Sequence, residues 1–256
     1  MQQHLPPVDA SNPTERYRMA KYAQLLKLAA VVCAGLVLTS ECVVRAGAAQ
    51  SGADRLKTVL GQMDAASARF HSAEANVQKL QYDPIVKDTT TETGAIYFLR
   101  SKGSMQVGAK FDPPDAQTLE YKNGLLRIYN AGNNQVQQYP AGGQNQARYE
   151  AFLALGFGGS GSDLAKAWEI ADQGSEQMSD GSRTVPVEKL DLVSKDAGVR
   201  ANFTHIAIWV DLARDVELKQ VGYAPSGTDT TIYTDIKVNQ AIDLKAFEIK
   251  CKGKCG

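Results

Sequence analysis

Residues 118–130 read Thr-Leu-Glu-Tyr-Lys-Asn-Gly-Leu-Leu-Arg-Ile-Tyr-Asn, two strand-like runs joined by Asn123-Gly124. Asparagine and glycine tolerate the positive φ that a type I′ turn requires, so this dipeptide predicts a β-hairpin. Similar short runs lie at residues 93–99, 105–111 and 135–139, with turn-forming residues between them. The stretch 91–139 therefore predicts an antiparallel meander, and the rest of the chain is expected to extend or cover it.

The last third of the chain returns to strand patterns. In residues 203–210, Ile206 and Ile208 alternate with Trp209 and Phe203, so both faces of that strand are largely apolar. A sheet with one solvated face would not need this. Either a helix covers one face, or the sheet curls round an apolar cavity. The predicted class is mainly β (α+β), with further strands at residues 184–193, 216–223 and 230–238.

Helical patterns are few. Residues 54–70 place apolar side chains at three- and four-residue steps, which predicts an amphipathic helix. Two short helices are predicted at 149–155 and 162–171. The run between them, Gly156-Phe157-Gly158-Gly159-Ser160-Gly161, formally matches the dinucleotide fingerprint, but the required strand–loop–helix–strand unit is missing. A hinge between two helices is the preferred interpretation.

The first 48 residues have the layout of a secretory signal. Lys27 precedes the apolar run 28–39, and Ala46-Gly47-Ala48 resembles a cleavage site. Met19 is a possible true start. An uncleaved inner-membrane anchor is the alternative, although a spanning helix needs about 20 apolar residues and charges bracket a shorter run here. The expected location is the periplasm.

Composition sets further limits. The chain has 28 basic and 28 acidic residues, which gives no indication of nucleic-acid binding. Residues 49–250 suit one β-rich domain. The tail 251–256 contains Cys251 and Cys255, which would form a small disulfide in an oxidising compartment, whereas a metal site would need more ligands.

No residue pattern indicates catalysis. Outside the predicted signal only His71 and His205 remain, far apart in sequence and without metal-ligand spacing. No G-x-S-x-G, H-E-x-x-H or Cys–His arrangement is present. We therefore expect a non-enzymatic protein with no catalytic residues, cofactor or metal. A lipid-acting enzyme, with a polar cluster inside a cavity, is the less favoured alternative.

Several motifs together resemble one known family. They are Gly94-Ala95-Ile96-Tyr97-Phe98-Leu99-Arg100, residues 123–130, Gln135-Val136, and Asn239-Gln240-Ala241-Ile242 before Phe247. Over about residues 53–250 the chain resembles the outer-membrane lipoprotein carriers of the LolA type and related periplasmic lipoprotein-sorting proteins.

The resemblance implies an unclosed antiparallel β-barrel with a helical lid over an apolar cavity. It implies lipoprotein transport: a monomeric periplasmic chaperone that binds the acyl chains of lipoproteins, or another lipid, and shuttles them toward the outer membrane. Its implied partners are the cargo, an inner-membrane ATP-driven release complex and an outer-membrane receptor. The alternative is a lipid- or lipoprotein-sensing binding module of the same fold.

The resemblance also suggests site residues. Arg100 matches an arginine implicated in closing the family's lid and passing cargo on, although Ser101 follows it where proline is common in the family. A surface arginine in a turn is the alternative reading. The candidates for lining the cavity, each of which could equally pack an ordinary core, are Ile96, Phe98, Met105, Val107, Leu119, Leu126, Ile128, Trp168, Phe203 and Trp209.

Overall fold

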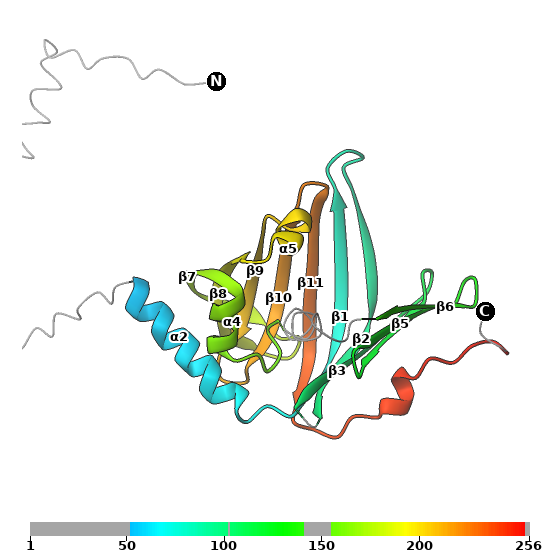
Figure 1. Cartoon of the computed structure of the whole chain (residues 1–256), viewed down its shortest axis with the longest axis horizontal. Helices are drawn as coiled ribbons and strands as arrows, with labels where there is room; N and C mark the ends of the chain where they lie inside the picture. Colours follow the sequence, from blue (N-terminus) through cyan, green and yellow to red (C-terminus); the bar gives the residue numbers. More distant parts are fainter. Residues whose placement is uncertain (1–51, 102, 141–154, 254–256) are drawn as a thin grey trace, which may run out of the picture. The chain divides into compact units, whose positions relative to one another are not determined.

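The computed structural model describes residues 52–101, 103–140 and 155–253. Their main element is one eleven-stranded sheet in which every neighbouring pair is antiparallel. The strand order is β6-β5-β4-β3-β2-β1-β11-β10-β9-β8-β7, so β6 and β7 are its two ends and the sheet is not closed. This confirms the predicted unclosed antiparallel architecture (Figure 1).

The sheet consists of two meanders joined by the pairing of β1 with β11. The first contains β1 (Ser72–Asp83), β2 (Asp88–Ser101), β3 (Ser104–Phe111), β4 (Gln117–Lys122), β5 (Leu125–Asn130) and β6 (Gln135–Pro140). The second contains β7 (Trp168–Ser179), β8 (Thr184–Ser194), β9 (His205–Asp211), β10 (Val216–Ala224) and β11 (Gly227–Val238).

The predicted Asn-Gly hairpin is confirmed. Asn123 and Gly124 have φ values of 52° and 72°, and Lys122 pairs with Leu125 across the two-residue turn. Positive φ at both central positions is the requirement of a type I′ turn, whose twist matches that of the strands it joins.

Helices cover one face at the β7–β9 end of the sheet. They are α2 (Gly52–Ser67) and α4 (Gly161–Ala167), which lie together there in Figure 1; α5 (Ala197–Asn202) joins β8 to β9, and the 3-10 helix η2 (Leu244–Phe247) contacts β3 and β4. Ile206, Ile208 and Val210 of β9 are 0% exposed and pack in one cluster with residues of α2 and α4. Of the two arrangements left open by the sequence, a helical cover therefore explains the apolar face of β9 that carries these residues.

Two predictions of secondary structure need correction or addition. The helix predicted at residues 162–171 ends at Ala167, because Trp168 takes an extended conformation and only its backbone N–H bonds back to Leu164. Residues 168–179 instead form β7 and pair with β8. The sequence did not predict α5, whose first turn is capped by the Asp196 side chain. The predicted signal, residues 1–48, and residues 149–154 of the other short helix lie outside the described residues.

Candidate functional site

The helix α2 is held to the sheet near both of its ends. Near its start, Nε of Arg55 lies 2.9 Å from Asp172 Oδ2 of β7, and Nη2 of Arg55 bonds to Glu188 of β8. Both carboxylates are nearly buried, with side chains 5% and 7% exposed. Because an unpaired buried charge is costly, these two carboxylates fix the first turns of α2 on the sheet.

Arg100, at the end of β2, holds the other end of α2. Its Nη1 donates to the carbonyl oxygens of Ser67 at 2.7 Å and Phe70 at 3.2 Å. Its Nη2 donates to the carbonyl oxygen of Gly158 and to Ser67 Oγ. A planar guanidinium can reach several carbonyls at once, which an ammonium cannot do in the same geometry. Arg100 thus ties the sheet, α2 and the glycine-rich segment together.

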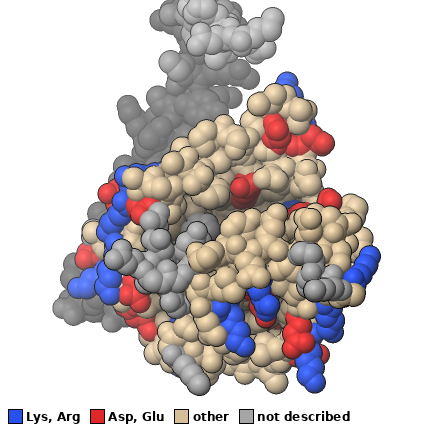
Figure 2. Space-filling view, turned by 45° about the vertical axis from the view of Figure 1, so that its right-hand side comes forward, with Lys and Arg blue, Asp and Glu red and all other residues tan. Residues whose placement is uncertain are grey.

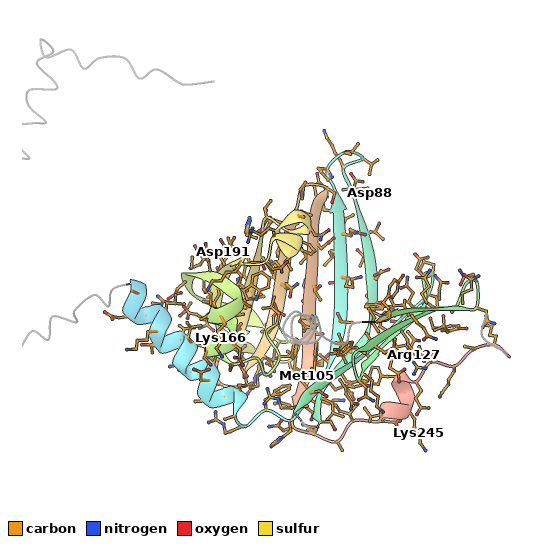
Figure 3. The ribbon with its side chains drawn as sticks, viewed as in Figure 1. Asp88, Met105, Arg127, Lys166, Asp191 and Lys245 are labelled. Carbon is orange, nitrogen blue, oxygen red and sulfur yellow. The ribbon has the colours of Figure 1, made fainter. Side chains whose placement is uncertain are left out.

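A cavity of about 430 Å³ lies among these elements, within the size range of small-molecule sites. Figure 3 labels Met105, near the start of β3, and Lys166, on α4, which mark two of the bordering elements. Three of the predicted residues, Arg100, Met105 and Trp168, line it. The other lining residues are Met63, Ser67, Gly103, Ser104, Leu155, Gly156, Gly158, Gly159, Ser160, Asp163, Leu164 and Ala167.

Residues 155–160, which we call the strap, pass between this cavity and the sheet. Phe157 is 0% exposed, pairs with Val216 of β10 in an isolated bridge, and stacks on Phe98 with ring centroids 4.0 Å apart. Gly158 has φ of 69°, and a Cβ on it would lie 2.2 Å from the Phe70 ring. The glycine-rich run therefore serves close packing, and no nucleotide-binding unit surrounds it, because the sheet is antiparallel throughout.

Two buried carboxyl groups lie beneath the strap. Glu217 of β10 is 0% exposed, and neither of its oxygens has a hydrogen-bond partner among the described residues. Burial raises its pKa well above the usual range. Burial also raises the pKa of Asp215 to about 7, although the positive charges of Arg100 and Arg69 act in the opposite direction. Burial thus favours the protonated form of Glu217 at neutral pH, whereas Asp215, with a pKa of about 7, titrates there.

The remaining predicted residues lie at other places. Phe98 and Val107 are buried in the large core cluster, and Ile96, Leu119 and Leu126 pack against it while partly exposed. Ile128 is half-buried on β5 opposite Leu119. None of these six lines the cavity, so the lining role proposed for them from sequence remains a prediction.

Phe203 and Trp209 belong to different clusters, although the sequence pattern put them on one face. Phe203 caps the C-terminus of α5 and packs with the cluster beneath α2 and α4, because β9 begins only at His205. Trp209 points to the opposite face, with the ammonium groups of Lys189 and Lys219 at 4.9 Å and 4.6 Å from its ring. Neither lines the cavity.

Other features bear on the sequence-based expectations. Cys251 is disulfide-bonded, and Cys255, its predicted partner, lies outside the described residues. Within residues 52–253 as described, no cluster of three metal-ligating side chains is found, and no helix is long and apolar enough to span a membrane. On the face shown in Figure 2, basic and acidic residues are interspersed, which agrees with the balanced composition.

Comparison with known proteins gives similarity in structure only. No protein-family model and no curated protein matches the sequence. The chain is similar to the crystal structure of MucB (14% identity, TM-score 0.49, 78% of this chain and 64% of that one), and so spans less than two thirds of MucB. It is also similar to an uncharacterised conserved protein from Thermus thermophilus (11%, 0.48, 78% and 96%) and a LolA superfamily protein from Nitrosomonas europaea (15%, 0.36, 76% and 97%). The family that the sequence motifs resemble is thus among the structural neighbours.

Sequence reasoning missed several residues of this site. Arg55 lies within the predicted helix 54–70 but was not singled out, and Phe157 was noticed only as part of a glycine run. Glu217 follows Val216 and precedes Leu218, so simple alternation would place it on a polar face. Glu217 does lie on the face opposite Val216 and Leu218, since it pairs with Val210, but that face is covered by α2 and α4 and not by solvent. The helical cover buries Glu217, and no local pattern in β10 records it.

Proposed function

We propose that the protein binds acyl chains of lipoproteins, or of another lipid, in the cavity beneath α2 and α4 and carries them through an aqueous compartment. The observation that carries this proposal is the 430 Å³ cavity whose wall includes Arg100, the side chain that also holds α2 and the strap in place. One residue thus links the binding space to the segments that would have to move for a ligand to enter.

The lining suits flexible apolar chains. Met63, Met105, Leu164 and Trp168 supply apolar surface, and methionine adapts its unbranched side chain to differently shaped ligands. Each CH₂ removed from water contributes about 0.8 kcal/mol, so a chain of several carbons gains enough to stay bound in water. Release then requires a cover that opens at low cost, which backbone-carbonyl contacts to one side chain can provide.

The same geometry favours binding over catalysis. Neither His71 nor His205 lines the cavity, and its titratable lining residues are Arg100 and Asp163. Asp163 already accepts hydrogen bonds from Lys166 and Ser160. We therefore propose a carrier without enzymatic activity, located in the periplasm and consisting of a cleaved signal (1–48), a carrier domain (49–250) and a cysteine-containing tail. An inner-membrane release complex and an outer-membrane receptor are the partners proposed from the sequence resemblance.

The first experiment is native mass spectrometry with lipid extraction on mature protein purified from periplasm without detergent. The proposal predicts a co-purifying acylated molecule, and saturable uptake of a fluorescent acyl probe after delipidation. Arg100→Leu should alter uptake, whereas Arg127→Leu is the matched control, because Arg127 pairs with Glu120 on β4 and does not line the cavity (Figure 3). A delipidated protein that takes up no acyl probe would refute the proposal.

A further inference from the structure

We propose that Phe157 occupies a deeper subsite of the same cavity, which an apolar ligand chain fills when the strap moves out. Beside this subsite, beneath Gly156, Glu217 would bind an uncharged hydrogen-bonding group of the ligand, such as an amide or a hydroxyl. The inference rests on the proposed function, since it specifies which ligands the cavity takes.

Gly156 of the strap borders both the cavity and the space around Glu217. On one side Gly156 and Gly158 line the cavity. On the other side Gly156 touches Glu217: a Cβ on Gly156 would lie 2.4 Å from Glu217 Cβ and 2.8 Å from Glu217 Oε2. Because glycine has no side chain, only the backbone of the strap separates the cavity from Glu217 at this point. Withdrawal of the strap would therefore join the cavity to the space around Glu217.

The space that Phe157 fills is shaped for an apolar group. Its ring stacks on Phe98 and meets Tyr233 edge-on at a centroid distance of 4.8 Å. Phe157 is the one aromatic side chain that the strap inserts, because its neighbours on both sides are glycines. A ligand chain entering between Phe98 and Tyr233 would recover the apolar contacts that the departing ring gives up.

Apart from the Phe157–Val216 bridge and the hydrogen bonds of Ser160 at the start of α4, the polar contacts of the strap converge on Gly158. Gly158 N–H donates to Asp215 O at 3.2 Å, and Gly158 O accepts from Ser67 Oγ at 2.6 Å and from Arg100. Ser67 ends α2 and Arg100 holds that same helix end. Opening of α2 would therefore remove the Ser67 contact, and the strap is released once Arg100, which belongs to β2, also moves away from Gly158 O.

Glu217 sets the chemistry of the space beneath Gly156. It is fully buried, forms no ion pair among the described residues, and both of its oxygens lack hydrogen-bond partners there. A neutral carboxyl group both donates and accepts, and an amide supplies both complementary partners. A charged headgroup would be stripped of water without an opposite charge to meet it, so the site favours an uncharged group.

Binding of two ligands of equal chain length tests this selectivity. Decanamide and methyl decanoate are titrated in competition against a dansyl-labelled undecanoic acid on delipidated protein. We expect decanamide to bind about tenfold more tightly, the equivalent of one or two added hydrogen bonds. Glu217→Leu should abolish that preference, and Glu217→Gln, which keeps a donor and an acceptor, should retain it.

The outcomes separate the two proposals. If the protein binds none of the three compounds, the proposed function fails. If it binds the amide and the ester equally, or if Glu217→Leu keeps the preference, the deeper subsite is refuted while the carrier function stands. Phe157→Ala should bind methyl decanoate about tenfold more tightly than the wild type, with Phe157→Leu intermediate; equal affinities in all three proteins would also overturn the subsite.

Hydrogen exchange on the wild-type protein gives an independent readout. Saturating decanamide should speed the exchange of the Gly158 amide by at least about tenfold, because that amide loses its Asp215 acceptor when the strap leaves. Amides of the β8–β9 core serve as the internal reference and should not exchange faster. Slower exchange at Gly158 with ligand bound would show that the strap stays in place, against the proposal.

Discussion

Nη1 of Arg100 lies 2.7 Å from the carbonyl oxygen of Ser67, so a side chain at the end of β2 holds the last residue of α2. The acceptor of this bond is a backbone atom, and Ser67 Oγ accepts a second bond from Nη2 of the same guanidinium. Arg100 is the donor in both bonds of this latch, so substitutions at Arg100 test the contact directly.

Arg100→Lys should fail to restore the latch. An ammonium is a compact point charge and cannot bridge the carbonyl oxygens of Ser67, Phe70 and Gly158 together. We expect Arg100→Lys and Arg100→Leu both to lower the local opening free energy of the C-terminal turn of α2 by about 1–3 kcal/mol. Native-state hydrogen exchange measures this opening free energy. If the amides of that turn were as well protected in Arg100→Lys as in wild type, the bridging role would be contradicted.

Arg55→Ala should loosen the other end of α2. It leaves the nearly buried carboxylates of Glu188 and Asp172 without their cation, and an uncompensated buried charge destabilises a fold. Because the Arg55 side chain is 40% exposed, solvent screens part of this loss. We expect a lower urea midpoint, measured by denaturation at pH 7. Lys166→Ala, which removes an exposed pair with Asp163, is the control and should leave the midpoint nearly unchanged; equal midpoints in the two variants would contradict the anchoring role.

Asp180 should stabilise the fold at neutral pH and lose this effect in acid. Burial favours its protonation, but hydrogen bonds from the backbone of Arg183 and Ser182 and from the Ser182 hydroxyl, with the charge of Arg214, outweigh it and hold its pKa well below the usual range. Since the folded-state pKa is lowered, the stabilisation is present above about pH 4 and falls as the pH drops further.

The variant Asp180→Asn isolates that charge, because asparagine keeps one acceptor oxygen for the turn. We expect it to lower the unfolding free energy at pH 7 by about 1–3 kcal/mol, with the difference from wild type shrinking below pH 4. Urea melts between about pH 2.5 and 7 test this. A difference that stays constant over the whole range would show that the charge is not responsible.

The stability of Glu217→Gln relative to wild type should change with pH in the direction opposite to that of Asp180→Asn. The pKa of Glu217 is raised in the folded state, so unfolding above about pH 4.5 releases a proton and wild-type stability falls as pH rises toward the folded pKa. Glutamine does not titrate. The variant should match wild type near pH 4 and gain relative stability by about 1.4 kcal/mol for each pH unit between the two pKa values.

Thermal melts from pH 4 to pH 8 measure that gain. Asp215, whose pKa is about 7, titrates in both proteins, so its contribution cancels in the difference. A variant that is less stable than wild type at every pH would mean that the Glu217 carboxyl makes hydrogen bonds essential to the fold.

Local patterns predicted the strands and turns that depend on nearby residues. The Asn123-Gly124 turn follows from the backbone preferences of two residues, and the helix near residues 54–70 follows from its apolar spacing; both are in the structure. β7 was missed because it is an end strand whose residues are mostly polar, with only Trp168 buried along its length. Its pairing with β8 stabilises it, and no local pattern records that pairing.

The candidate site was predicted only in part for the same reason. Arg100 was identified through a family resemblance, and the structure supplies its physical role. Asn239 was likewise part of a motif, and the structure shows its side chain bonding to the backbone of Arg69, His71 and Ser72. Glu217 and Phe157 could not be assigned, since the burial of Glu217 depends on the helices that cover its face of β10, and that of Phe157 on contacts with a segment about 60 residues away in sequence.

The pairing of β1 with β11 has a consequence for how the chain matures. Ala73 lies opposite Val238, so the two meanders are joined by the pairing of the first strand of the sheet with the last. Until β11 has been synthesised, β1 and β10 each expose an unpaired edge, and such edges are templates for aggregation. A truncation before residue 227 would therefore leave two additional unpaired strand edges, on β1 and β10, and such a protein should aggregate more readily than the full chain.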